Sequence, residues 1–181
     1  MDKVLFIKEF VKNWKEVGSV TPSSPFLVRK MLAPIDFEKA KIVVELGPGS
    51  GVFTRGLLSK MLPDAKLLAF ETNKEFCQEL EKIGDTRLSV YNDSASNLEK
   101  YLDGRSVDYV VSGIPLANLD NTDKQNLLST AYRSLTPGGK YIQFQYTLES
   151  RSELQQVFDN VSIGFTLFNI PPAFVYTCVK K

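Results

Sequence analysis

Short apolar segments alternate with segments of helical periodicity along most of the chain. The apolar segments are rich in β-branched or aromatic residues and have turn residues at their borders, as buried strands do. They lie at 42–46, 66–70, 87–91, 107–112 and 140–146. Helical patterns lie at 52–62, 74–83, 95–102, 121–135 and 150–159. This alternation predicts right-handed crossovers and a mostly parallel sheet with helices on both faces.

The C-terminal segment departs from this alternation. It reads VSIGFTLFNIPPAFVYTCVKK (161–181), two extended runs that are joined by Asn169, Ile170, Pro171 and Pro172 without a helical pattern between them. We therefore expect an antiparallel hairpin at the end of the sheet. The predicted fold class is α/β: a Rossmann-like, doubly wound, mostly parallel seven-stranded sheet that binds its ligand beyond the carboxyl ends of the strands.

An amphipathic helix is predicted near the N-terminus, at 2–17. Its apolar stripe includes Phe10 and Trp14, lysines flank that stripe, and Glu9 and Glu16 lie opposite. A stripe of this kind is typical of a helix that lies on a membrane surface. It is equally typical of a helix packed over the core of the sheet. The pattern leaves both interpretations open.

Length and composition limit the organisation and the chemistry. A chain of 181 residues predicts a single domain, here 1–181, with a helical cap at 1–35 and a ligand-binding core at 40–181. Its 22 basic and 21 acidic side chains nearly cancel, so nucleic acid is not an expected partner. Histidine is absent, which excludes histidine triads and histidine-ligated metals, and no metal is expected.

The cellular setting follows from what the sequence does not contain. Two cysteines, Cys77 and Cys178, are too few for a disulfide framework, and they fit a reduced, cytoplasmic setting. No apolar run approaches the ~20 residues of a spanning helix. Charged residues interrupt the N-terminus where a signal peptide would need an apolar core.

A glycine-rich turn, VELGPGSG (44–51), follows the first predicted strand and precedes a helix. Gly47, Gly49 and Gly51 permit positive φ angles and let a ligand approach the backbone amides. A dinucleotide-binding turn has the spacing G-x-G-x-x-G, whose third glycine would fall at Val52. The spacing therefore counts against a dehydrogenase, while an ordinary strand-to-helix turn remains an alternative.

Three acidic residues lie in or at the ends of consecutive predicted strands. Glu71 ends the second strand, where its two oxygens could accept hydrogen bonds from both hydroxyls of a ribose. Asp93 follows the third strand, placed to accept from an adenine amino group. Glu45 lies inside the apolar first strand, so its carboxylate must be paired or face a ligand.

Together with the glycine turn, this arrangement resembles the class I S-adenosylmethionine-dependent methyltransferases over residues 40–146, including the segment LTPGGKY at 135–141. The resemblance implies S-adenosyl-L-methionine as the cofactor. It implies three groups of contacts: Glu45, Gly47, Gly49 and Gly51 with the methionyl part, Glu71 and Thr72 with the ribose, and Asp93 and Ser94 with the adenine.

The segment SGIPL (112–116), at the end of the fourth strand, is expected to select the methyl acceptor. Pro115 has no amide hydrogen and restrains the chain, so that nearby carbonyls can be directed at an incoming amine. Enzymes that methylate the amine of a flat base have Asn or Asp at the first position of the corresponding segment and an aromatic residue after its proline. Ser112 and Leu116 occupy these positions here, which favours a non-planar amine.

A closer resemblance extends along nearly the whole chain. The segments FIKEFVKNWKEVGSVTPSSPFLVRKML, VSGIPL, YIQFQYT and NIPPAFVY are similar to the bacterial phospholipid N-methyltransferases. This implies methylation of the amine of a phospholipid such as phosphatidylethanolamine, by a cytoplasmic, peripherally membrane-associated protein. It also implies that residues 18–24, with Ser19 and Thr21, cover the methionine end of the cofactor.

The expected mechanism is in-line attack of a neutral amine on the sulfonium methyl, assisted by positioning. Carbonyls near Gly113 and Ile114, or Tyr146, are expected to orient the amine while water takes the proton. Two alternatives remain. One is methylation of an RNA adenine, because the chain also resembles the ribosomal RNA adenine dimethylases; the other is a cofactor-binding or membrane-binding module without catalysis.

Overall fold

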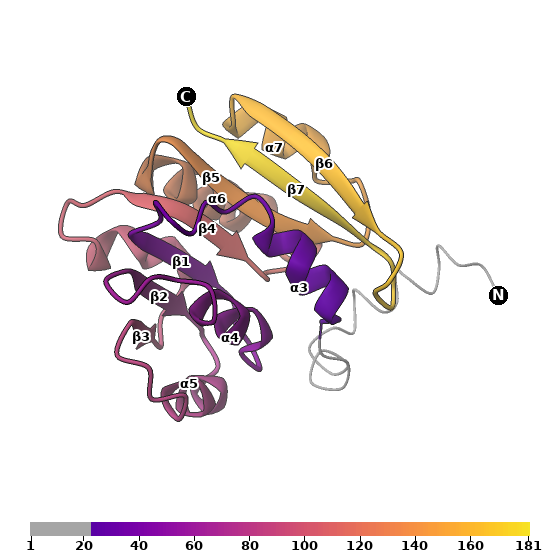
Figure 1. Ribbon diagram of the computed structural model, residues 1–181. Coiled ribbons are helices and arrows are strands. Elements are labelled where there is room, and N and C mark those ends of the chain that lie inside the picture. Colours follow the sequence, from indigo (N-terminus) through magenta and orange to yellow (C-terminus); the bar gives the residue numbers. More distant parts are fainter. Residues whose placement is uncertain (1–22) are drawn as a thin grey trace.

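The computed structural model describes residues 23–181 of the chain (Figure 1). The predicted helix at 2–17, with Ser19 and Thr21, lies outside the described residues.

The core is a seven-stranded sheet in the order β3-β2-β1-β4-β5-β7-β6. The first five strands in that order are parallel, and β7 runs antiparallel to both β5 and β6. This confirms the predicted fold class, including the antiparallel C-terminal hairpin. The strands are β1 (Ile42–Leu46), β2 (Lys66–Phe70), β3 (Leu88–Tyr91), β4 (Val107–Ser112), β5 (Leu135–Gln145), β6 (Asn160–Thr166) and β7 (Ala173–Val179).

Helices cover both faces of the sheet. In Figure 1, α3 and α4 lie in front of it, and α6 and α7 lie behind it. The segment predicted as a helix at 95–102 is the 3-10 helix η1, and a second short 3-10 helix, η2, follows β4. The helices are α3 (Pro25–Leu32), α4 (Val52–Leu58), α5 (Lys74–Glu81), η1 (Ala95–Tyr101), η2 (Leu116–Asn118), α6 (Asn121–Ser134) and α7 (Arg151–Val157).

Alternating side chains of the central strands build two separate apolar cores. Val43 and Val111 point to the face that α3 and α4 cover, whereas Val44 and Val110 point to the face under η1, α6 and α7. Successive side chains of a strand point to opposite faces, so a strand buried on both sides reads as a continuous apolar run. This burial holds the central strands in register and fixes where each of their carboxyl ends lies.

Strand β5 begins five residues earlier than the sequence pattern predicts. Leu135 already pairs with Val107, and an irregularity follows before Tyr109 pairs with Lys140. Gly138 takes a positive φ of 80° in this stretch. The residues LTPGG therefore form an irregular start of β5, in which Leu135 pairs with β4 while Gly138 and Gly139 hydrogen-bond with Lys180 after β7.

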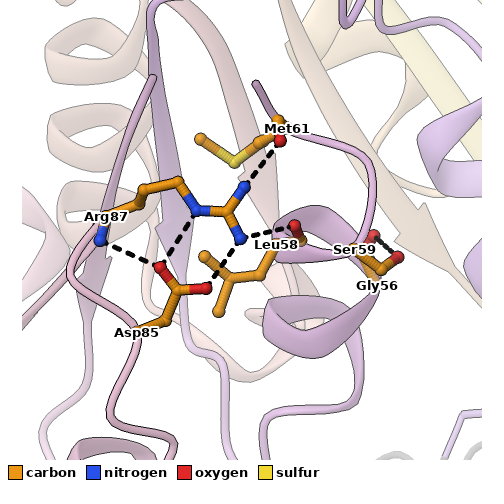
Figure 2. Close-up of polar contacts among 6 residues, drawn as sticks. All are labelled: Gly56, Leu58, Ser59, Met61, Asp85 and Arg87. Carbon is orange, nitrogen blue, oxygen red and sulfur yellow. Dashed lines mark hydrogen bonds and ion pairs between the residues drawn. The ribbon is translucent and has the colours of Figure 1, made fainter. Parts of the chain in front are cut away.

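An Arg87–Asp85 ion pair fastens α4 to the outer part of the sheet (Figure 2). The Arg87 guanidinium donates to both Asp85 oxygens, at 3.0 and 2.6 Å. It also donates to the carbonyl oxygens of Met61, at 2.6 Å, and Leu58, at 2.8 Å. The hydrogen bonds from Arg87 hold the pKa of Asp85 at about 2. One side chain thus satisfies the carbonyl of Leu58 at the end of α4 and that of Met61 in the turn that follows the helix.

We expect Arg87→Met to lower the free energy of unfolding by about 2 kcal/mol at pH 7, because two carbonyls and a carboxylate lose a charged donor. Arg105→Met is the matched control, since Arg105 is exposed and its Asp103 partner lies 3.5 Å away. Urea unfolding of both variants measures the difference. The low pKa of Asp85 gives a second check: the effect of Arg87→Met should shrink as the pH falls from about 4 towards 2. Equal losses in the two variants would contradict this account.

Candidate active site

The loops after β1 and β4 pack directly against each other. Gly47, with φ +67°, donates its N–H to the carbonyl of Phe70 at 2.9 Å, and Gly113 donates to the carbonyl of Leu46 at 2.8 Å. A Cβ on Gly113 would lie 2.7 Å from the Gly47 oxygen, and a Cβ on Gly47 would lie 2.8 Å from Cγ1 of Ile114. Only glycines allow this approach. The predicted cofactor turn and the predicted acceptor segment are therefore neighbours.

Glu71 joins the glycine turn to the end of β2. Its Oε2 accepts from the Gly49 N–H at 3.0 Å, and its Oε1 accepts from the Asn73 N–H at 2.9 Å. A Cβ on Gly49 would meet nothing within 4 Å, so the space over this glycine is open. The side-chain amide of Asn92 donates to the carbonyls of Glu71 and of the exposed Thr72, at 2.9 and 3.0 Å. The sequence reasoning did not find Asn92.

Asp93 lies among polar groups and aromatic rings after β3. Its Oδ1 accepts from the Asn97 amide at 2.8 Å and from the Ser94 N–H at 2.7 Å, and its Oδ2 accepts from the Tyr101 hydroxyl at 2.7 Å. These bonds, with that from Asn97 the largest influence, hold the pKa of Asp93 below its usual value. The rings of Tyr91 and Tyr101 are 4.4 Å apart beside it. An ionised acceptor next to aromatic faces suits a planar, amino-bearing group.

Two of the predicted cofactor residues also shape the starts of helices. Gly51 precedes α4 with φ +77°, and a Cβ there would lie 2.8 Å from the side chain of Leu80 on α5. Ser94 precedes η1, and its hydroxyl accepts from the Ser96 N–H at 3.3 Å. These contacts give both residues a structural role in addition to the predicted one.

Glu45 is a buried carboxyl group without a partner. The residue is 1% exposed, and neither of its side-chain oxygens has a hydrogen bond within the described part of the chain. The nearby Thr54 hydroxyl on α4 also lacks one. Burial raises the pKa of Glu45 to about 8; the charge of Glu71 adds to this rise, and the hydroxyl and backbone N–H of Thr54, placed nearby without normal hydrogen-bond geometry, oppose it. A buried acceptor of this kind suits a ligand group that carries donors and positive charge.

A buried network of hydrogen-bonded side chains orients the predicted acceptor segment. Ser112 is fully buried, and its hydroxyl accepts from the Ile114 N–H at 3.3 Å. The carbonyl of Ile114 accepts from Nε2 of Gln143 at 2.9 Å. That amide also donates to the Phe144 carbonyl at 2.8 Å, and its oxygen accepts from the Tyr141 hydroxyl. Gln143 was not predicted from the sequence, although the two glutamines of the stretch YIQFQ, Gln143 and Gln145, were a signal.

The residue at the position where a flat base would stack is buried and cannot contact a base. Leu116 is fully buried in the core that α6 and α7 cover, and it begins η2. Pro115 precedes it in an extended conformation, and its carbonyl accepts from the Asn118 N–H at 3.0 Å. The segment therefore offers no exposed aromatic ring on which a base could stack.

Tyr146 follows the end of β5 on the same edge of the sheet as these loops. Burial raises the pKa of its phenol, and the side chain of Asn169 partly opposes the rise. The hydroxyl therefore stays protonated at neutral pH and cannot serve as a base there. Its ring packs edge-on to Phe144, with centroids 5.7 Å apart.

Two further observations concern residues 23–181. No group of three Cys, Asp or Glu side chains in this range is arranged to hold a metal ion. The helices of this range are too short or too polar to cross a membrane.

Comparisons with known proteins identify the shared core. A family model described as a methyltransferase domain matches residues 43–139, which is more than half of the chain. The chain is 30% identical, over 98% of its length and 95% of the relative's, to an ornithine lipid N-methyltransferase from Singulisphaera acidiphila.

Solved structures share the fold at lower identity. An rRNA methylase from Streptococcus thermophilus superposes with a TM-score of 0.65 at 19% identity, covering 87% of this chain and 98% of that one. A precorrin-6y C5,15-methyltransferase from Geobacter metallireducens gives a TM-score of 0.68 at 13% identity, covering 90% and 95%. At these identities the likeness concerns the fold alone. The family match and the full-length relative place the chain in the methyltransferase domain family, as a class I S-adenosylmethionine-dependent methyltransferase.

Proposed function

We propose that this enzyme transfers methyl groups from S-adenosylmethionine to the amine of a lipid headgroup. The similarity to a lipid N-methyltransferase carries this proposal, because it extends over 98% of the chain and so includes the segments on both sides of the matched domain at 43–139. The shared domain accounts for the cofactor.

The residues around the glycine turn fit the cofactor. The unpaired carboxyl of Glu45 supports a contact with the ammonium of its methionyl part, under Gly47, Gly49 and Gly51. Glu71, with Thr72, would take the ribose hydroxyls, and Asp93, with Ser94, would take the adenine amino group. Ser19 and Thr21 are proposed to cover the methionine end. When bound, the cofactor supplies an electrophilic methyl group on a sulfonium.

The acceptor segment then has to hold a neutral amine close to that methyl group. The carbonyls of Gly113 and Ile114 are the proposed acceptors for the amine hydrogens, and Gln143 fixes the direction of the second of these carbonyls. Ser112 and Pro115 restrain the backbone on either side. Tyr146 keeps its own proton, so water is the proposed proton acceptor. The ring of Tyr146 is proposed to stabilise the methylated cation by cation–π attraction.

Two lipid amines are the candidate acceptors. Phosphatidylethanolamine is the acceptor implied by the family resemblance, and ornithine lipid is the one named for the full-length relative. Both carry a primary amine on a flexible, non-planar headgroup. The burial of Leu116 favours such an acceptor over the base of an RNA, because a stacked base would need an exposed ring.

The direct test is incubation of the protein with methyl-labelled cofactor and three separate acceptors: vesicles with phosphatidylethanolamine, vesicles with ornithine lipid, and ribosomal RNA. We expect label in the lipid fraction and none in the RNA. Label in RNA alone would refute the proposal. Cofactor binding without transfer to any of the three would favour a silent binding module.

Gln143→Met should reduce the turnover number about tenfold or more while leaving cofactor affinity unchanged, because the Ile114 carbonyl loses the donor that orients it. Gln145→Met is the matched control. Gln145 is a buried glutamine on the same strand, and its Nε2 has no partner within the described residues. Steady-state kinetics and calorimetric titration separate turnover from binding. A similar loss in both variants would contradict a positioning role for Gln143.

Glu45→Gln should stabilise the ligand-free protein in a pH-dependent way. The carboxyl has an ordinary pKa of 4.5 when unfolded and about 8 when folded, so unfolding releases a proton between these values. Glu45 therefore costs stability progressively as the pH rises from about 4.5 to about 8, and the cost is constant above that. Thermal unfolding should show a larger gain for Glu45→Gln at pH 8 than at pH 5. An equal gain at both pH values would show that burial does not raise this pKa.

We also propose that the segment at 2–17 associates with the membrane surface, on the strength of its sequence pattern alone. Trp14→Glu should then abolish sedimentation with vesicles and spare cofactor binding, because a charge replaces the aromatic side chain of the apolar stripe. If the substitution instead lowers the melting temperature without lipid, the stripe belongs to the core.

A further inference from the structure

Large apolar side chains are exposed together at the loop that joins β6 and β7. Leu167, Phe168 and Ile170 are 67%, 68% and 78% exposed. Phe26, at the start of α3, is 45% exposed and packs on Phe168, with ring centroids 4.9 Å apart. We call these four residues the apolar tip. A contiguous exposed group of this kind marks an interaction surface more often than isolated apolar residues do.

Hydrogen bonds hold this loop in place. Between the exposed Phe168 and Ile170 lies Asn169, which is 5% exposed. Its Oδ1 accepts from the Ser24 N–H at 3.0 Å, and its Nδ2 donates to the Pro171 carbonyl at 2.8 Å. The Ser24 hydroxyl donates to the Phe168 carbonyl at 2.6 Å. The fold therefore directs the amide inward and its apolar neighbours outward.

The apolar tip lies on the active-site edge of the sheet. Phe174 of β7 pairs with Gln145 at the end of β5, so the residues before Phe174 continue beyond the carboxyl end of β5. Figure 1 shows this loop beside the start of α3, beyond the ends of the central strands. Asn169 also interacts with Tyr146, which is a proposed acceptor-site residue. The tip and the acceptor site are thus adjacent.

Two cationic side chains of α3 lie next to the tip and β6. The guanidinium of Arg29 lies 5.3 Å from the centroid of the Phe26 ring. Lys30 lies across β6, where a Cβ on Gly164 would be 2.6 Å from its Cε. The segments that carry the tip and these cations, 23–33 and 164–174, contain no Asp or Glu. The apolar residues at the tip match the acyl chains of a bilayer, and the cations of α3, which lie further from the end of the tip, match the lipid phosphates.

We propose that the apolar tip inserts into a bilayer, with Arg29 and Lys30 at the level of the lipid phosphates, and that this holds the active-site edge against the membrane. The inference deepens the proposed lipid amine methylation and rests on it. It adds a second membrane contact, separate from the segment at 2–17. A projecting tip suits a deformable bilayer, whereas a protein partner would need a groove shaped to receive it.

The first experiment is sedimentation with phosphatidylcholine vesicles, with and without phosphatidylglycerol, in the absence of cofactor. Leu167→Ser, Phe168→Ser and Ile170→Ser should each weaken binding on the order of tenfold. Leu62→Ser is the control, because Leu62 is an exposed leucine at the opposite edge, before β2. Replacing both Arg29 and Lys30 by Gln should remove only the preference for phosphatidylglycerol.

The second experiment measures insertion directly. Both native cysteines, Cys77 and Cys178, are buried, so a polarity-sensitive fluorophore can be attached selectively at Leu167→Cys. Its emission should shift to the blue when vesicles are added. The same fluorophore at Leu62→Cys should not shift.

Several results would overturn the proposal. The tip variants could bind vesicles like the unaltered protein, or the label at 167 could remain in water. A lower melting temperature or a changed sedimentation coefficient of the tip variants without lipid would show that residues 1–22 or a second copy of the chain cover the tip instead.

Activity separates this proposal from the proposed function. If the tip variants methylate lipid dispersed in detergent but not lipid in vesicles, the result supports both the lipid methyltransferase activity and the insertion of the tip. If no lipid is methylated while vesicle binding still requires the tip, only the proposed function fails.

Discussion

The site depends on the close contact of two backbone segments. The Gly47 carbonyl leaves no room for a side chain at Gly113, and Ile114 leaves none at Gly47. Because β1 and β4 are adjacent and parallel, their carboxyl ends already meet at one edge, and the two glycines let the following loops touch. One loop belongs to the proposed cofactor site and the other to the proposed acceptor site. The reaction requires these two sites to be within bonding reach of each other.

Buried polar groups around this contact divide into satisfied and unsatisfied ones. The chain from Tyr141 through Gln143 to the Ile114 carbonyl is satisfied, which makes it a rigid support for the acceptor side. Glu45 on the cofactor side is unsatisfied and has a strongly raised pKa. An unpaired buried carboxyl group costs stability, and a cationic ligand would compensate for it. A contact between the cofactor and Glu45, as proposed, would couple stability and cofactor binding through this one residue.

The sequence predicted the fold well where local patterns decide it. The apolar runs at 42–46, 66–70 and 107–112 coincide with β1, β2 and β4, because strands buried on both faces need continuous apolar sequence. The glycine turn was recognisable because positive φ angles favour glycine strongly. The pattern failed at 135–139, where one pair with β4 and hydrogen bonds with Lys180 add an irregular stretch to the strand. Tertiary contacts override local preference there.

The polar partners within the site could not be predicted in this way. Asn92, Asn97 and Gln143 act through contacts with other elements or with the preceding loop, and no spacing rule assigns those partners, even where a buried glutamine stands out in the sequence. The exposure of the apolar tip was also hidden, because FTLFNI reads as an ordinary strand end. Only the packing shows that Asn169 points inward while its neighbours point outward.

The most direct test of the central contact is the single-turnover rate of methyl transfer by Gly113→Ala at saturating cofactor. The added methyl group would lie 2.7 Å from the Gly47 oxygen, so the two loops have to separate. We predict at least a tenfold slower transfer with the far-UV circular dichroism spectrum unchanged, because misplacement of the reacting groups by a fraction of an ångström to 1 Å is costly. An unaltered transfer rate in a folded Gly113→Ala protein would contradict the account.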